Sequence, residues 1–257
     1  MRTSADWLRH FETNARQLRI IPWERGAELT TEESAAIASS VAEFQRGESG
    51  EGRHLIRYAI QYAELTGDLE YVGAIRLFIR EEQRHARDLA RFFTLNGIPL
   101  ARASFADAVF RRLRNLLGTL EMSIAVLITA ELMAQVYYDR LGVATQSTIL
   151  RRLCEQILDD EARHVEFQAE RLGMLRARRG KLGYLATMAF QRMLFAATSV
   201  VVWHAHRRAF RQADFAFVQF WKGAWCCFDA AFRISSQARA ATRYSRRPAP
   251  PPLADAY

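Results

Sequence analysis

The chain has 257 residues, of which 50% are hydrophobic and 25% charged, so it is long enough to bury one sizeable core. Its 36 Lys and Arg residues outnumber 28 Asp and Glu residues, for a formal net charge of +8. This excess fits an acidic partner such as a carrier protein, a nucleic acid or an anionic membrane surface. The three cysteines, Cys154, Cys226 and Cys227, form no CxxC pair. A disulfide scaffold and a thiolate zinc site are therefore not expected, and a reducing compartment fits best.

The N-terminal residues lack the apolar segment of a secretory signal. The longest uncharged apolar stretch in the C-terminal third, residues 193–203, has about half of the roughly 20 residues that a spanning helix needs. We therefore expect a cytoplasmic protein without a membrane-spanning segment.

Helical periodicity runs through the chain, and strand signals are nearly absent. Thr30 and Glu33 have the spacing of a capping box, which begins a first helical segment, and Gly47 interrupts it. The predicted helices that follow span residues 51–65, 69–95, 105–141, 147–175, 182–212 and 215–237. Gly97 is the predicted stop of the second of these.

The predicted organisation is all-α. Residues 1–46 form an N-terminal helical extension, and residues 47–176 form a four-helix bundle. Residues 177–245 form C-terminal helices packed on the bundle. Residues 246–257 begin with a proline-rich run that cannot hold a helix, so we expect a disordered tail there.

Each of the four central helices carries a glutamate on its apolar stripe. Glu82 and Glu131 each interrupt a face that is otherwise apolar, Glu51 begins the stripe of the first helix, and Glu161 shares a face with His164. An unpaired buried carboxylate is very costly, so such groups need protons, partners or a metal. Four that converge make a metal the simplest answer.

Two histidines strengthen this prediction. Residues 82–85 and 161–164 both read Glu-x-Arg-His, and residues three apart lie on one face of a helix, so each pair can bind one cation. Glu51 precedes Glu82 by 31 positions and Glu131 precedes Glu161 by 30. Two helical hairpins with these separations bring their glutamates to similar depths.

Two of the helices each supply one carboxylate, and the other two each carry a Glu-x-x-His motif. Over about residues 48–175, this pattern resembles the ferritin-like superfamily of di-iron and di-manganese proteins. The two sequence motifs most resemble those of soluble di-iron oxygenases and acyl-carrier-protein desaturases. Residues 81–85 read Glu-Glu-Gln-Arg-His and residues 160–164 read Asp-Glu-Ala-Arg-His. The resemblance implies a ferritin-like bundle that binds two iron ions, or iron and manganese. The implied ligands are Glu51, Glu82, His85, Glu131, Glu161 and His164.

The first-helix ligand has an alternative in Glu48, which lies on the same face as Glu51. Helix rise measured from the turn near Gly67 favours Glu51. The resemblance also implies that Glu81 and Asp160 each orient the histidine of the opposite motif, because a metal-bound histidine usually donates its other N–H to a carboxylate.

Arg84 and Arg163 are placed to pair with these acids, and the alternative for all four side chains is an exposed helix face of salt bridges. Tyr58 and Tyr138 each follow a proposed ligand by seven residues, and a packed core tyrosine is favoured over a redox-active one. His204 and His206 lie two apart, so they should point to different sides as solvated or capped histidines.

The resemblance implies an O₂-activating oxidoreductase that oxidises an organic, apolar substrate, free or bound to a carrier protein. It further implies an external electron donor of the ferredoxin or reductase type and a homodimer. The predicted apolar channel is lined by Leu55, Phe78, Ile79, Leu127 and Ala134.

One departure keeps a second hypothesis open. Many O₂-activating relatives carry a threonine one turn after the third-helix glutamate, where this chain has Ala134 and Gln135. The alternative is a ferritin-like metal-binding, ferroxidase or peroxide-handling protein without an organic substrate. A third hypothesis is an interaction or membrane-surface bundle that uses its arginine-rich faces. A nucleic-acid partner is not expected, because no aromatic–basic RNA module is recognisable.

Overall fold

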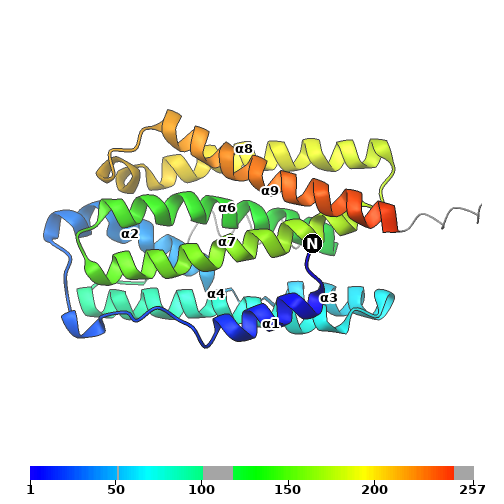
Figure 1. The fold of residues 1–257 in the computed structure, drawn as a ribbon. Helices are drawn as coiled ribbons and strands as arrows, with labels where there is room; N and C mark the ends of the chain where they lie inside the picture. The colour runs from blue at the N-terminus through cyan, green and yellow to red at the C-terminus, as the bar shows by residue number, and fades with distance from the viewer. Residues whose placement is uncertain (51, 101–117, 246–257) are drawn as a thin grey trace, which may run out of the picture.

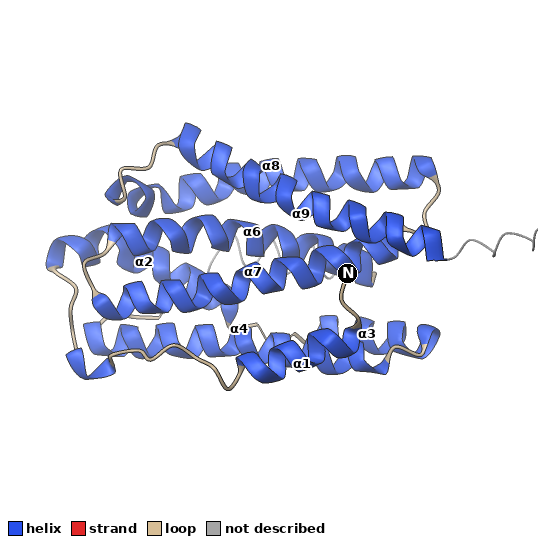
Figure 2. Ribbon diagram, in the orientation of Figure 1, coloured by secondary structure: helices blue, strands red, loops and turns tan. Residues whose placement is uncertain are grey.

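The computed structural model describes residues 1–50, 52–100 and 118–245, and within these ranges the chain is helical without a strand (Figure 2). This confirms the predicted all-α class. The helices are α1 (Ser4–Asn14), α2 (Thr31–Glu48), α3 (Arg53–Thr66), α4 (Leu69–Asn96), α6 (Leu120–Ala144), α7 (Thr148–Arg176), α8 (Lys181–Gln212) and α9 (Phe217–Ser245). A short 3-10 turn, Trp23–Arg25, lies between α1 and α2.

Local sequence sets several helix ends. The hydroxyl of Thr30 accepts from the backbone N–H of Glu33, while the Glu33 carboxylate accepts from the backbone N–H of Thr30, which completes the predicted capping box of α2. Helix α4 stops at Gly97, whose φ of 65° is in the left-handed region that favours glycine. These ends agree with the prediction to within one or two residues.

The helices form three layers (Figure 1). Helices α6 and α7 pack against each other in the middle, α4 lies on one side with α1 and α3, and α8 and α9 lie on the other side. Helix α2 contacts α4, α6 and α8. The three-layer arrangement therefore places α4, α6 and α7 around a common interior, with α2 beside it.

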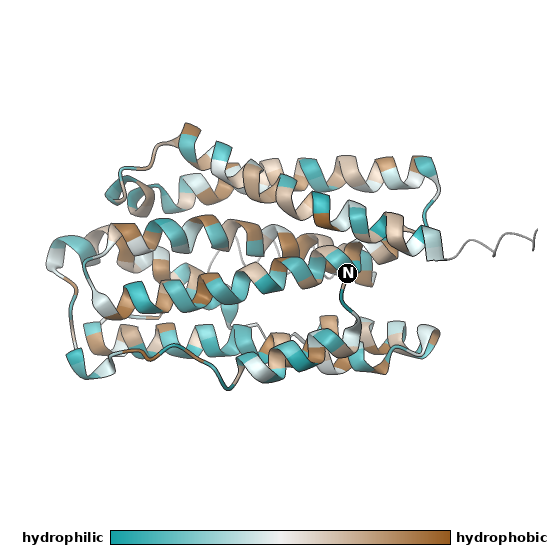
Figure 3. Ribbon diagram, viewed as in Figure 1, coloured by the Kyte–Doolittle hydropathy of each residue, from teal (hydrophilic) through white to brown (hydrophobic). Residues whose placement is uncertain are grey.

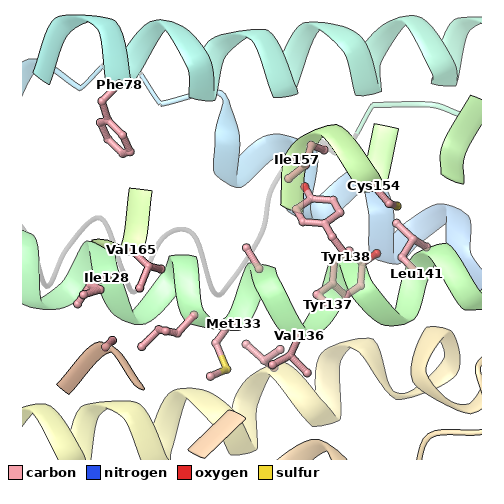
Figure 4. Close-up of a cluster of buried hydrophobic side chains, with 14 of the residues drawn as sticks. Phe78, Ile128, Met133, Val136, Tyr137, Tyr138, Leu141, Cys154, Ile157 and Val165 are labelled. Atoms are coloured by element: carbon pink, nitrogen blue, oxygen red, sulfur yellow. The ribbon is translucent and has the colours of Figure 1, made fainter. Parts of the chain in front are cut away.

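One continuous hydrophobic core joins all the layers. It runs from Trp7 and Phe11 of α1 to Phe228 of α9. Figure 4 shows a central part of this core, where Tyr137 and Tyr138 of α6 lie near Leu141 of the same helix and near Cys154 and Ile157 of α7. The N-terminal and C-terminal helices are thus part of the same packed body as the central helices.

The predicted helix 51–65 corresponds to α3 (Arg53–Thr66), but the predicted interruption at Gly47 is wrong. Helix α2 continues through Gly47 to Glu48, so the predicted boundary between residues 46 and 47 falls inside a helix. An internal glycine costs a helix only about 1 kcal/mol, which tertiary packing readily offsets. The predicted helix 105–141 is not continuous, because Gly118 and Thr119 lie outside any helix and α6 begins at Leu120. Helix α6 ends three residues later than predicted, at Ala144. Residues 105–117, Glu51 and the predicted tail 246–257 lie outside the described residues.

Two described helices, α6 and α8, are long and apolar enough to cross a membrane by length and composition alone. In α6 the apolar window is 78% buried inside the protein, as expected for a core helix. In α8 the window is only 33% buried. An apolar face that is largely exposed is unusual for a helix that also packs along α6 and α2.

Helix α7 approaches α9 so closely at Gly173 that a side chain does not fit there. A Cβ atom at this position would lie 2.2 Å from the backbone oxygen of Ser235 and 2.9 Å from the backbone nitrogen of Arg239. We predict that Gly173→Ala destabilises the protein by about 1–3 kcal/mol through overpacking. Thermal unfolding followed by circular dichroism measures this as a lower Tm.

Gly223→Ala in α9 is the matched control, because its new methyl group would meet no atom within 4 Å. Removal of a helical glycine should leave Tm unchanged or raise it, through about 0.5–1 kcal/mol of helix stabilisation. A Gly173→Ala variant as stable as Gly223→Ala would contradict the close contact between α7 and α9.

Candidate metal centre

Four helices bring six polar side chains together in the interior. Among the described residues, two overlapping groups each have the donor set for one metal ion. One contains Glu48, Glu82, His85 and Glu161, and the other contains Glu82, Glu131, Glu161 and His164. Within each group, one ligand atom per residue lies within 4.8 Å of all the others. Glu82 and Glu161 belong to both groups, so two adjacent ions would share them.

Helix geometry explains the pairs. Glu82 and His85 lie three residues apart on α4, as do Glu161 and His164 on α7, so each pair faces the same side of its helix. Glu131 comes from α6, and Glu48 is the last residue of α2. Five of the six predicted ligands therefore lie in the cluster, and the sixth, Glu51, is outside the described residues. Its alternative, Glu48, occupies the place of the first-helix ligand.

The donor atoms fit a cation. Both carboxylate oxygens of Glu161 and the Nδ1 atoms of His85 and His164 are buried, and none has a hydrogen-bond partner among the described residues. The Nδ1 atom of His164 lies 2.9 Å from Oε1 of Glu82 without making a hydrogen bond to it. Buried groups of this kind are expensive unless an ion compensates them. Carboxylates with two imidazoles suit iron or manganese.

The pKa shifts within the cluster also favour a bound cation. Burial raises the pKa of Glu48 and of Glu82, and the negative charges of neighbouring glutamates raise both further. The pKa of Glu161 is raised by burial and by Glu131. Burial by itself would lower the pKa of His164, but the surrounding carboxylates outweigh it and raise that pKa. A divalent cation would relieve the repulsion that raises the pKa of these carboxyl groups.

Each histidine is held from behind by an acid of the opposite helix. Nε2 of His85 lies 2.9 Å from Oδ2 of Asp160, and Nε2 of His164 lies 2.9 Å from Oε2 of Glu81. This is the crossed arrangement that the resemblance implies. Since Nε2 of each ring faces a carboxylate of the opposite helix, Nδ1 is the nitrogen that faces the cluster and would bind a metal ion.

The two arginines of the motifs behave differently. Arg84 forms a half-buried ion pair with Asp160. Although burial works in the opposite direction, His85 and Arg84 hold the pKa of Asp160 well below its usual range. The pairing predicted for Arg163 is wrong, because this side chain points to the surface and pairs with Glu166 at 2.9 Å.

Sequence reasoning missed a contribution from α1. The side-chain amide of Asn14 donates to Oε1 of Glu81 at 2.6 Å and to Oδ1 of Asp160 at 2.7 Å. One residue thus joins the two acids that hold the two histidines. Asn14 is 67 and 146 positions away from these acids, so local spacing carries no signal for it.

Two glutamines also support the cluster. Gln156 donates to Asp160 at 3.0 Å, and Gln168 donates to Oε1 of Glu131 at 3.0 Å. The sequence indicated that Gln168 lies near the cluster, because it shares a helix face with Glu161 and His164.

The two tyrosines singled out in the sequence differ. The hydroxyl of Tyr138 is buried and donates to Oε1 of Glu48 at 3.0 Å, so Tyr138 touches the cluster. Tyr58 is buried too, but its hydroxyl accepts from Arg57 at 3.3 Å. The spacing of seven residues thus identified one neighbour of the centre and one ordinary core residue.

The two C-terminal histidines point to different sides, as predicted. His204 is exposed, whereas His206 is buried with Nδ1 2.9 Å from Oγ of Ser40. Burial lowers the pKa of His206 to about 4. Neither histidine belongs to the two metal-binding groups of the described residues.

The residues of the predicted channel lie in the core. Leu55, Phe78, Ile79 and Ala134 are buried, and Leu127 is partly buried against them. The ring of Phe78 packs edge-on to the ring of His164, with centroids 4.6 Å apart. Phe78 thus packs against a member of the cluster, and a channel through these side chains stays a prediction.

Fold and centre together define a class, a ferritin-like helical bundle with a carboxylate and histidine site for two metal ions. The structure is similar to that of an R2-like ligand-binding oxidase, a mutant with an aerobically reconstituted Mn/Fe cofactor, with a TM-score of 0.64. The two share 16% sequence identity, and the match covers 91% of this chain and 93% of the oxidase. At this identity the likeness is one of fold. No family model and no curated protein matches the chain.

Glu48 and Glu51 can be distinguished by substitution. We predict that Glu48→Gln lowers the affinity for Fe(II) by more than about tenfold, because it removes a charged donor from one of the two groups. Glu51→Gln is the matched control, with the same change three residues away, and should keep about two ions per chain. Elemental analysis after anaerobic Fe(II) loading and desalting gives both numbers. Loss of iron in the Glu51 variant alone would refute Glu48 as the ligand.

The role of Asn14 is also testable. Asn14→Ala removes both amide hydrogen bonds to the acids behind the histidines, so we predict a loss of metal affinity of about tenfold. Thr13→Ala is the control, since the Thr13 hydroxyl only donates to the backbone oxygen of Arg9. The measurement is a competition titration with a metal chelator. Equal affinities of the two variants would show that Asn14 does not position the histidines.

Proposed function

We propose that the protein is a di-metal carboxylate oxidoreductase that uses O₂ to oxidise an organic, apolar substrate. The observation that carries this proposal is that Glu82 and Glu161 belong to both metal-binding groups. Two ions that share ligands are close enough to act together. Two iron ions, or one iron and one manganese, would supply the electrons for reduction of O₂ when bound.

Hydrogen bonds from neighbouring side chains orient the ligands of this centre. Asp160 and Glu81 fix the rings of His85 and His164 by the crossed hydrogen bonds at 2.9 Å. Gln168 fixes one oxygen of Glu131, so that the carboxylate keeps its other oxygen for a metal ion. The two oxygens of Glu161 have no hydrogen-bond partner among the described residues, so this carboxylate would keep both of them for the metal ions.

The surroundings can exclude water and hold a proton. The rings of Phe11 and Phe78 pack against His164, with centroids 6.0 Å and 4.6 Å away. Dry surroundings strengthen the electrostatic interactions of the centre and protect reactive species from side reactions. The hydroxyl oxygen of Tyr138 lies 3.0 Å from Oε1 of Glu48 and donates a hydrogen bond to it. Burial raises the pKa of Tyr138, so this hydroxyl holds its proton against that carboxylate.

The similar structure supports the choice of metal and reaction. It is described as a ligand-binding oxidase with a Mn/Fe cofactor, and the present chain shares its fold over nearly its whole length. Catalytic reduction of O₂ needs an external supply of electrons, so the proposal includes a donor of the ferredoxin or reductase type. A substrate bound to a carrier protein, a homodimer and a cytoplasmic location remain predictions from the sequence.

A second function is favoured by one observation. The position of the threonine in many O₂-activating relatives is taken by Ala134, and the nearby hydroxyl of Thr129 donates to the backbone oxygen of Ala125. The centre would then lack that hydroxyl, and the protein would oxidise Fe(II) or handle peroxide without an organic substrate.

Oxygen uptake distinguishes the two functions. The protein is loaded anaerobically with Fe(II), mixed with air-saturated buffer in an oxygen electrode, and supplied with a chemical reductant and an extract of apolar metabolites. We predict continued O₂ uptake, with products that mass spectrometry detects as oxidised metabolites. Glu161→Ala, which removes a shared ligand, should lower the rate at least tenfold, to about background.

Two results would contradict the oxidase. Uptake of O₂ that stops when the loaded Fe(II) is used up, with no oxidised metabolite, would favour the ferroxidase. Uptake no faster than that of Glu161→Ala would exclude both functions at this centre.

A further inference from the structure

The outer face of α8 is an exposed apolar stripe. Leu182, Met193 and Val200 on this face are 82%, 66% and 40% exposed. Residues between them at helical spacing are also exposed and apolar, namely Ala186, Ala189 and Ala197. The stripe from Leu182 to Val200 covers 19 residues, or about 27 Å between its ends, without a charged residue along its centre. Hydrophobic residues recur along α8 in the layer farthest from α4 (Figure 3).

The same face becomes basic at its end. Arg207, Arg208 and Arg211 are exposed and continue the stripe through the last turns of α8, while Lys181 is exposed at the start of the helix. Residues 177–245 hold 11 Lys or Arg residues and 2 Asp residues, a net charge of +9, whereas the whole chain carries +8. The excess positive charge of the protein thus belongs to the α8–α9 layer, and the rest of the chain has slightly more acids than bases.

The neighbouring helix adds aromatic residues. At the start of α9, Phe217 is 39% and Val218 60% exposed, and the ring of Phe217 lies 5.6 Å from that of Trp203 on α8. Further along α9, Trp221 and Trp225 line a shallow hollow with Lys222, Cys226, Asp229 and Arg233. Tryptophan beside basic side chains is typical of surfaces that meet the headgroup region of a membrane.

A second copy of the chain is a poor occupant of this face. Helix α8 contains no acidic residue. A parallel pair of α8 helices would bring Arg207 and Arg211 against the same residues of the other copy. An antiparallel pair would bring them against Lys181. Either pairing costs like-charge repulsion, and neither offers a carboxylate from α8 in return.

A membrane-spanning α8 does not fit either. Its inner face packs along α6 and α2 and buries polar side chains, including Gln191, Ser199 and His206. A helix in the membrane core would expose these groups to lipid. An exposed apolar stripe that ends in basic residues instead suits a helix that lies in the plane of an interface, with its exposed apolar face in the acyl boundary and its basic residues at the headgroups.

We propose that the α8 face, meaning the exposed residues of α8 with the start of α9, docks on the surface of an anionic lipid bilayer. The apolar stripe provides burial, and the basic residues at its end provide attraction to anionic headgroups. This proposal concerns a surface away from the metal centre and does not depend on the function proposed for that centre.

Vesicle flotation tests the docking surface. The purified, metal-loaded full chain is mixed with vesicles of phosphatidylcholine, or of phosphatidylcholine with phosphatidylglycerol. We expect it to float only with the anionic vesicles, and its bound fraction to fall as salt is raised, because salt screens the headgroup attraction. A wild-type protein that floats with neither kind of vesicle would overturn the proposal.

A matched pair of double variants locates the surface. The variant Leu182→Glu with Met193→Glu changes residues of the stripe that are 82% and 66% exposed. The control, Leu65→Glu with Leu69→Glu, changes residues near α3 and α4 that are 83% and 70% exposed, with the same change in charge. We expect the first to weaken vesicle binding by at least about tenfold and the control by less than about threefold. An equal loss in both would refute the assignment to α8.

Two further measurements complete the test. Circular dichroism checks that the variants fold. If the α8 double variant does not, Arg207→Ser with Arg208→Ser replaces it, and weaker binding to the anionic vesicles with a smaller salt dependence is the expected result. Light scattering gives the oligomeric state. A wild-type dimer that the α8 variant dissociates would make this face a contact between copies and would overturn the proposal.

Discussion

The structure depends on the cost of burying carboxylates. Four glutamates from four helices share one interior, where each ionised carboxylate repels the others and has lost its water. Such an arrangement persists in a packed core only with protons or cations to balance it. The surrounding features follow from this constraint, since the two histidines present unpaired Nδ1 atoms, and the glutamates present unpaired oxygens, to the same space.

The two acids that contact the histidines, Glu81 and Asp160, are subject to the same cost of burial. Glu81 and Asp160 are themselves buried, and each meets a histidine of the other helix and the amide of Asn14. Arg84 adds a positive charge beside Asp160. In this way α1, which supplies no ligand, ties α4 to α7 across the centre. A hydrogen-bond network of this type gives the histidines a fixed orientation before any metal binds.

Positive and negative charges are concentrated in two different regions of the protein. The bundle around the centre holds most of the acids, whereas the α8–α9 layer holds a net charge of +9. This layer covers α6 and α7 with one face and presents an apolar and basic surface with the other. A surface that attracts anionic partners is thus kept apart from a centre that attracts cations.

The sequence by itself determined the all-α class and five members of the cluster, because helical spacing alone puts Glu82 with His85 and Glu161 with His164 on single faces. It also indicated the acids before each motif, since these belong to the same short strings. It favoured Glu51 over Glu48, whereas the structure places Glu48 in the cluster, because the course of the chain at Gly47 depends on how α2 packs against α4, α6 and α8. Only the tertiary structure showed that Glu48 meets Tyr138 and that Asn14 bridges two acids far away in sequence. The physical reason is that spacing fixes which residues share one helix face, whereas packing between helices fixes which faces meet.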